Sequence, residues 1–162
     1  MILFTADWHI KLGQKNVPVD WAKNRYSLFF KQVHELEKEC NMHIIGGDLF
    51  DRLPTMEELE LYFLFIRKVS IPTIIYDGNH EATKKHKTFF TNLKKVRKDI
   101  NPLVTVIDIS YIDHDLGFGI LPYADIHRKN SIEHFDASMP LFTHVRGEIP
   151  PHVKPEIDLT RF

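Results

Sequence analysis

Three short polar blocks carry the side chains that divalent metal ions prefer in proteins. Each block directly follows an apolar run that is typical of a buried strand. Carboxylate, imidazole and amide groups are suitable ligands for such cations, and loops at the strand ends of an α/β sheet lie along one edge. The ordered set therefore predicts a metal site at one edge of a sheet. The blocks are Asp7-Trp8-His9, Gly47-Asp48-Leu49-Phe50-Asp51 and Gly78-Asn79-His80-Glu81.

The first two blocks provide carboxylates and one imidazole. Asp7 and His9 alternate along the chain, so on an extended backbone both side chains point the same way and can bind one cation. Asp48 follows two glycines that allow a tight turn, and we expect its carboxylate to bridge two cations and to be catalytic. Two cations about 4 Å apart can share a hydroxide and hold a phosphoryl group. Asp51 is expected to buttress this loop rather than to bind metal.

The third block adds an amide and a second imidazole. Asn79 offers a neutral oxygen to the second cation, and Gly78 is expected to permit an unusual backbone beside it. His80 is then an unligated catalytic imidazole that can bind the phosphate or protonate the leaving oxygen. Its alternative role is to hydrogen-bond the metal ligands. A later apolar run over residues 140–143 ends at His144, which we expect to be the fifth ligand.

The elements that position these blocks alternate between strand and helix. A helix capped by Asp20 is expected to run to about Cys40, and the capping-box pattern beginning at Thr55 predicts another helix to about Val69. Because each connection is helical, we expect parallel strands with right-handed crossovers. The predicted strands cover residues 2–6, 42–46 and 73–76.

The second half of the chain has shorter elements. Residues 88–98 predict a helix, and a further strand precedes His144. Between them, three short runs separated by turn-forming residues predict antiparallel strands. The expected fold class is therefore α/β, with a mixed sheet flanked by helices. The three runs cover residues 104–107, 111–113 and 118–121.

Length and composition indicate one globular domain over residues 1–162, with 43% hydrophobic residues. The formal net charge of −1 gives no overall basic character that would indicate nucleic-acid binding. No apolar run approaches the roughly 20 residues of a membrane span, and the N-terminus lacks a signal-peptide pattern. We therefore expect an intracellular protein with no membrane partner. The single cysteine, Cys40, excludes a disulfide within the chain.

A local basic cluster follows the third block and could follow a DNA backbone close to the metal ions. A solvated helix face is an equally good interpretation of these charges. Arg146 could contact a phosphate or pair with Glu148. The candidate DNA-binding residues are Lys84, Lys85, Lys87 and Arg146.

The three blocks resemble the calcineurin-like metallophosphoesterase superfamily, whose D-x-H, G-D-x-x-D and G-N-H-[DE] motifs appear here in order. The resemblance extends to His144 and implies the N-terminal portion of an α/β/β/α sandwich. It also implies that His80 serves the leaving group. The implied ligands are Asp7, His9 and Asp48 for the first ion, and Asp48, Asn79 and His144 for the second.

A finer resemblance lies in Thr5-Ala6-Asp7-Trp8-His9 and in the second block, which are similar to the SbcD-like nuclease subunits of double-strand-break repair complexes. Large tailed phages carry such exonucleases. The resemblance implies a phosphodiesterase acting on DNA in recombination and repair, in which a hydroxide held by two divalent ions attacks phosphorus. The ions would be Mn²⁺, with Mg²⁺ as the alternative. The implied partners are DNA and an SMC-like coiled-coil ATPase subunit; a homodimer and a location in the host cytoplasm are further expectations.

The family also has a downstream G-x-H-x-H block that supplies one histidine to each metal ion. No such block lies between Gly147 and Phe162. We therefore expect an N-terminal piece of a longer protein, in which each ion lacks one ligand. Two alternatives remain: a metallophosphoesterase that acts on phosphoproteins or small nucleotides, and an inactive fragment of the nuclease.

Overall fold

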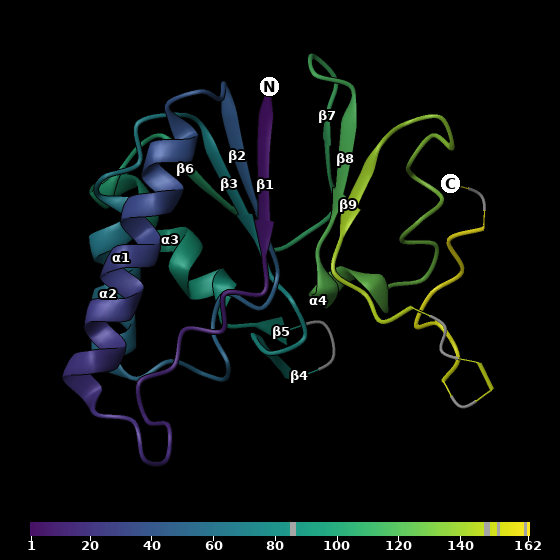
Figure 1. The fold of residues 1–162 in the computed structure, drawn as a ribbon. Helices are drawn as coiled ribbons and strands as arrows, with labels where there is room; N and C mark the ends of the chain where they lie inside the picture. Colours follow the sequence, from purple (N-terminus) through teal and green to yellow (C-terminus); the bar gives the residue numbers. More distant parts are fainter. Residues whose placement is uncertain (85–86, 148–149, 152, 161) are drawn as a thin grey trace.

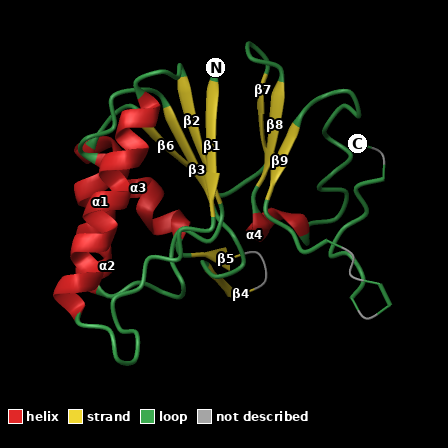
Figure 2. Ribbon diagram, in the orientation of Figure 1, coloured by secondary structure: helices red, strands yellow, loops and turns green. Residues whose placement is uncertain are grey.

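A first β-sheet of four strands and a second of three strands face each other, with helices over the outer face of the first sheet (Figures 1 and 2). Ala82–Lys84 and Lys87–Thr88 form a separate two-stranded sheet. This architecture comes from a computed structural model that describes residues 1–84, 87–147, 150–151, 153–160 and 162. The α/β class predicted from the sequence is confirmed. In chain order the elements are β1 (Ile2–Ala6), α1 (Val19–Glu37), β2 (Met42–Gly46), α2 (Met56–Ile66), β3 (Thr73–Tyr76), β4 (Ala82–Lys84), β5 (Lys87–Thr88), α3 (Phe90–Ile100), β6 (Val104–Ile107), β7 (Tyr111–Asp113), β8 (Phe118–Leu121), α4 (Tyr123–Ile126) and β9 (Leu141–Thr143).

The first sheet is parallel and has the strand order β1-β2-β3-β6. Its first three strands have the predicted bounds, and α1 and α2 form the crossovers between them. The prediction that β6 belongs to an antiparallel group is wrong, because β6 pairs in parallel with β3. The helix α3 supplies the crossover that makes this parallel pairing possible. The three metal-site blocks follow the carboxyl ends of β1, β2 and β3, and these ends lie at one edge of the parallel sheet.

The second sheet is mixed. Strand β8 pairs antiparallel with β7, as predicted, and parallel with β9. The two sheets enclose a small core that includes Tyr76 from β3 and Phe118 from β8. Phe142 of β9 packs against Phe4 of β1 with their ring centroids 5.3 Å apart. This contact brings β9, and with it His144, to the side of the first sheet where β1 lies.

The helix ends differ from the predictions in several places. Helix α2 ends at Ile66 rather than at about Val69, and α3 extends to Ile100 rather than ending at position 98. Helix α1 begins after Pro18, and Asp20 lies in its first turn without capping it. Cys40 lies beyond α1, because that helix ends at Glu37. Helix α3 begins at Phe90, whose amide donates to the Oγ1 of Thr88 at 3.2 Å. The capping box of α2 is present, since Thr55 and Glu58 bond reciprocally.

The main core lies between the helices and the first sheet. It includes the first metal-site block, because Trp8 is 8% exposed and packs edge-on against Phe65 of α2 at 4.8 Å between centroids. The block is thus anchored in the core through the residue between its two polar side chains. Among the described residues, none of the helices has the length and apolar character that crossing a membrane requires.

Candidate metal centre

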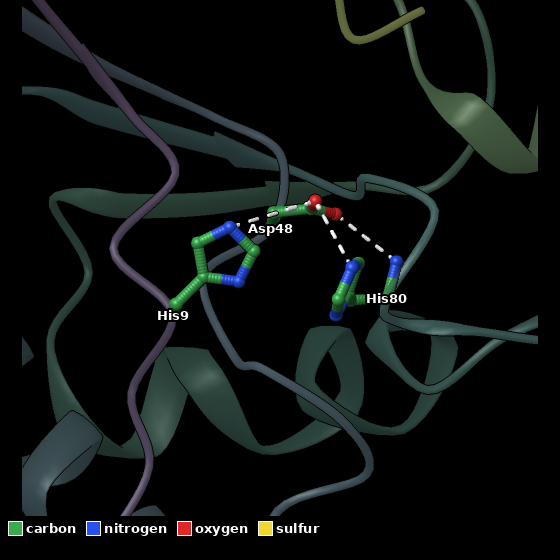
Figure 3. A group of neighbouring side chains, drawn as sticks. All are labelled: His9, Asp48 and His80. Atoms are coloured by element: carbon green, nitrogen blue, oxygen red, sulfur yellow. Dashed lines mark hydrogen bonds and ion pairs between the residues drawn. The ribbon is translucent and has the colours of Figure 1, made fainter. Parts of the chain in front are cut away.

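Three imidazoles surround the carboxylate of Asp48, which lies just beyond the end of β2. Their Nε2 atoms lie 3.3 Å (His144), 3.7 Å (His80) and 3.9 Å (His9) from the same oxygen, Asp48 Oδ2. Figure 3 shows His9 and His80 next to each other on one side of this carboxylate, and their ring centroids lie 4.9 Å apart. The side chain of Asp48 is only 5% exposed, so these nitrogens meet it in a partly desolvated place.

The side chains form two groups that share Asp48. The first group is His9, Asp48 and His80; the second is Asp7, Asp48 and His144. Within each group the candidate ligand atoms all lie within 4.8 Å of one another. His9 also links the groups, because its Nε2 lies 3.8 Å from Asp7 Oδ1. A carboxylate common to both groups is the arrangement expected of a bridge between two cations.

The backbone at these residues is not the extended one predicted from the alternation of Asp7 and His9. Asp7, His9 and Asp48 have φ angles of 56°, 45° and 47°, so each occupies the left-handed region. A non-glycine residue there costs on the order of 1–3 kcal/mol and persists only where its surroundings fix it. Here the His9 amide donates to the Asp48 carbonyl at 3.0 Å, and the Asp7 amide donates to the Gly47 carbonyl at 3.2 Å. The convergence of the ligands thus depends on strained backbone held by contacts between two loops.

Gly78 is required at this site because a larger residue would clash with Asp48. The prediction that it permits an unusual backbone is wrong, since its φ lies outside the left-handed region. A Cβ at this position would lie 2.2 Å from Asp48 Oδ1 and 2.4 Å from the Asp48 amide nitrogen. Only glycine therefore allows the third block to approach the second this closely.

Glu81 holds the second and third blocks together. Its carboxylate is 1% exposed and accepts hydrogen bonds from the amides of Asp48 (3.1 Å), Phe50 (2.8 Å) and Gly78 (2.8 Å). Burial raises the pKa of Glu81 to about 7, although these amides act in the opposite direction. In the sequence, Glu81 was recognisable only as part of a motif. Its position directly after the polar residues of that block was the one signal of a supporting role.

The electrostatics favour a charged pair between Asp48 and His144. Burial alone would raise the pKa of Asp48, but the hydrogen bonds from His144 and from the His80 amide, with the charges of both histidines, lower it. The hydrogen bond to Asp48 raises the pKa of His144, and burial opposes this increase. In the absence of a cation, a proton on the imidazole thus stabilises the carboxylate.

Asp51 contacts both sides of the centre without joining either group. Its Oδ2 lies 2.6 Å from the Lys11 ammonium, and its Oδ1 lies 3.8 Å from His9 Nδ1. The Asp51 carbonyl accepts a hydrogen bond from His80 Nδ1. Because a carbonyl can only accept, a neutral His80 has its proton on Nδ1 and directs the lone pair of Nε2 towards Asp48.

Asn79 lies at the rim of the centre. It lines a cavity of about 440 Å³ together with Lys84, Tyr123 and His127. Its role as a ligand of the second cation stays a prediction. Lys84 and Lys87 are exposed on the β4–β5 hairpin, whereas Lys85 falls outside the described residues.

Arg146 has a partner that the sequence did not indicate. Its Nη2 lies 3.6 Å from Glu156 Oε1, and its amide donates to Glu156 Oε2 at 2.8 Å. The alternative partner, Glu148, falls outside the described residues. The guanidinium is still largely exposed, at 63% of the side chain.

The donor set fits divalent cations. Ligand atoms around an octahedral cation with bonds of about 2.1 Å are separated by about 3 Å, and the nitrogen–oxygen separations at Asp48 are only slightly larger, at 3.3–3.9 Å. His9 Nδ1 is buried and has no hydrogen-bond partner among the described residues; the Asp51 carboxylate lies 3.8 Å from it, beyond hydrogen-bond distance. Mixed carboxylate and imidazole ligands suit Mn²⁺ as well as harder cations.

Comparison with known proteins supports the same chemistry. The family model described as calcineurin-like phosphoesterase matches residues 1–153. The chain is also 41% identical over 165 residues to a protein named probable exonuclease subunit 1 of Escherichia phage T5. That alignment covers 99% of this chain and 50% of the phage protein, so the chain spans about half the length of this relative.

Proposed function

The chain belongs to the calcineurin-like phosphoesterase family, and from this premise we propose that it hydrolyses phosphodiester bonds in DNA with two divalent cations. The observation that carries the proposal is Asp48, whose carboxylate belongs to both groups of candidate ligands. Mn²⁺ is the proposed ion and Mg²⁺ the alternative. When bound, the cations would stabilise the charge on the phosphoryl group and supply a hydroxide nucleophile at neutral pH.

The residues of this chain have distinct roles in the proposal. Asp7 and His9, whose nearest ligand atoms lie 3.8 Å apart, would hold one cation with Asp48, while Asn79 and His144 would hold the other with the same carboxylate. This division differs from the two spatial groups, in which Asp7 lies with His144 and His9 lies with His80. The separation of 3.3 Å between His144 and Asp48 supports their sharing an ion.

His80, in the imidazolium form with a proton on each ring nitrogen, is the proposed proton donor to the leaving oxygen. Its Nδ1 bonds the Asp51 carbonyl, so the ring is held with Nε2 facing the centre. Its side chain is 35% exposed, which leaves room for a phosphate to approach. The proximity of His80 to Asp48 also allows it to serve as a ligand, and the His80→Ala variant separates the two roles.

DNA is the proposed substrate. The phage relative is named an exonuclease subunit, and the cavity beside Asn79 combines a lysine with aromatic side chains. Lysines follow phosphates, and aromatic rings stack on bases. The word subunit in the name of this relative supports a partner protein, which we propose to be an SMC-like ATPase; a homodimer is the alternative assembly.

A competing function is hydrolysis of phosphoproteins or small nucleotides by the same centre. We would separate the two by replacing Lys84 and Lys87 with alanine in the full-length protein. The matched control is Lys31→Ala with Lys68→Ala, which removes equal charge from the groove between α1 and α2.

The salt dependence of DNA binding is the measurement. Each lost phosphate contact should lower the slope of log affinity against log salt by about 0.9 for duplex or about 0.7 for single strands. Hydrolysis of a small chromogenic phosphodiester should stay near the wild-type rate in both double variants. An unchanged slope for the Lys84 and Lys87 variant, with DNA cleavage intact, would contradict their role at the substrate.

A further inference from the structure

A line of hydrogen bonds runs through the core from α1 to the first metal-site block. Trp8 Nε1 lies 3.1 Å from Thr5 Oγ1, and Thr5 Oγ1 lies 2.8 Å from His43 Nε2. His43 Nδ1 then lies 2.8 Å from Glu37 Oε1. The line connects residues of α1, β2 and β1 with Trp8 in the loop after β1. It ends between two candidate ligands, because Trp8 separates Asp7 from His9.

The far end of this line is firmly anchored. Glu37 and His43 are both 0% exposed. The second carboxylate oxygen of Glu37 lies 2.7 Å from His34 Nδ1, so both of its oxygens have partners. A buried carboxylate is costly unless it is paired and hydrogen-bonded. The two histidine partners of Glu37 meet this requirement, so its carboxylate is fixed at the end of the line.

The donors and acceptors of these side chains assign the direction of the line. An indole N–H can only donate, so Thr5 Oγ1 accepts from Trp8. The one proton of the Thr5 hydroxyl is then free to be donated to His43 Nε2. His43 in turn carries its proton on Nδ1 and donates it to Glu37. Every group in the line is satisfied in this arrangement, and it leaves Trp8 with one position for its indole nitrogen.

Trp8 lies between the two residues of the metal-site block whose backbone is strained. The residues on both sides of it have left-handed φ angles, 56° at Asp7 and 45° at His9. Such backbone persists only where the surrounding structure fixes it. The Trp8 ring is held by edge-on contacts with Phe29 at 5.1 Å and Phe65 at 4.8 Å, and the hydrogen bond to Thr5 fixes its rotation.

We infer that Thr5, His43 and Glu37 are positioning residues for the metal centre, holding Asp7 and His9 in place through the indole of Trp8. None of the three belongs to either group of candidate ligands. This role rests on the proposed function of the centre, since it concerns the affinity for the cations. The buried hydrogen bonds would thus have a function in addition to stabilising the core.

The test is Thr5→Val in the full-length protein, with Mn²⁺ binding measured by calorimetry. The substitution removes the hydroxyl at nearly constant volume. Thr73→Val is the matched control, because Thr73 lies on β3 directly beside His43 and is 1% exposed. Its hydroxyl donates to the Ile71 carbonyl at 3.1 Å, outside the line.

We expect Thr5→Val to weaken Mn²⁺ binding by about 10-fold or more, in the range found when groups that orient metal ligands are removed. Thr73→Val should stay within about twofold of the wild type while losing similar stability to urea. Thr5→Ser should restore the affinity. Equal Mn²⁺ affinities in Thr5→Val and Thr73→Val would overturn the inference, whereas a wild-type protein that binds no Mn²⁺ would overturn the proposed function itself.

A second variant keeps the test decisive if Thr5→Val folds poorly. Trp8→Phe retains a ring in the core but removes the indole donor. We expect it to lower the Mn²⁺ affinity as Thr5→Val does, and the double variant to be no weaker than either single one, because both break the same hydrogen bond. Additive losses in the double variant would show that Thr5 does not act through Trp8.

Discussion

Replacing Gly78 with alanine should damage the metal centre far more than it damages the fold. The new Cβ would lie 2.2 Å from Asp48 Oδ1 and 2.4 Å from the Asp48 amide. Ordinary contacts of a Cβ begin at about 3.4 Å, so the carboxylate and its backbone would have to move by roughly 1 Å. The Gly78 amide is itself bonded to Glu81 at 2.8 Å, which prevents the third block from moving away freely.

The expected magnitudes follow from that displacement. Overpacking of this kind costs about 1–3 kcal/mol of stability. A misplacement of about 1 Å at a reacting centre can cost about 10²-fold in rate. We therefore expect Gly78→Ala to remain folded, to bind Mn²⁺ at least about 10-fold more weakly, and to lose about 100-fold in phosphodiester hydrolysis.

The assay compares calorimetric Mn²⁺ titration with urea unfolding in the full-length protein. Gly13→Ala is the matched control, because its Cβ would make only an ordinary contact of 3.7 Å with the Arg52 side chain. Equal Mn²⁺ affinities in Gly78→Ala and Gly13→Ala would refute the reasoning. They would mean that Asp48 can move by roughly 1 Å without weakening the binding of the cations.

Three further predictions concern one histidine and two carboxylates. His80→Ala should keep its Mn²⁺ affinity but slow turnover by about 10² to 10⁴-fold, because a proton donor contributes that much; a loss of affinity as large as that of Asp48→Ala, measured by calorimetry, would make His80 a ligand instead. Asp51→Asn should leave the Mn²⁺ affinity within about threefold of the wild type, because Asp51 pairs with Lys11 and belongs to neither group of ligands. A loss of Mn²⁺ affinity as large as that of Asp7→Asn would contradict this. Glu58→Gln should destabilise the fold by about 1–3 kcal/mol at pH 7, since Glu58 accepts from the Leu12 amide at 2.8 Å and from Arg52 at 2.8 Å. Burial alone would raise the pKa of Glu58, but its hydrogen bonds with Thr55, Leu12 and Arg52 lower it. The contribution of Glu58 to stability is therefore present above the unfolded pKa of about 4.3, and it is lost as the pH falls through the lower folded pKa. Urea unfolding should show the difference between Glu58→Gln and the wild type shrinking below about pH 4, and a constant difference would contradict the linkage.

Local patterns predicted the elements of the first sheet well. The strands before the three blocks have the bounds expected from their apolar runs, and Thr55 caps α2 as its spacing with Glu58 indicated. These signals depend on residues close together in the sequence. The partner of β6 does not, because parallel pairing with β3 is decided by the crossover through α3 and by packing against the second sheet.

The candidate site shows the same division between local and distant information. The types and spacing of the three blocks pointed to Asp7, His9, Asp48 and His144, which the structure brings together. The left-handed backbone at Asp7 could not be predicted, because it is imposed by hydrogen bonds from another loop. The three amides held by Glu81 are likewise set by the packing of one block on another.

The most direct test of the central claim is the stoichiometry and spin coupling of bound Mn²⁺ in the full-length protein. If Asp48 bridges two cations, titration followed by electron paramagnetic resonance should give two ions per chain with the spectrum of an exchange-coupled pair. Asp48→Asn should lose the coupled spectrum. A single uncoupled ion in the wild type, or an unchanged coupled pair in Asp48→Asn, would contradict the account.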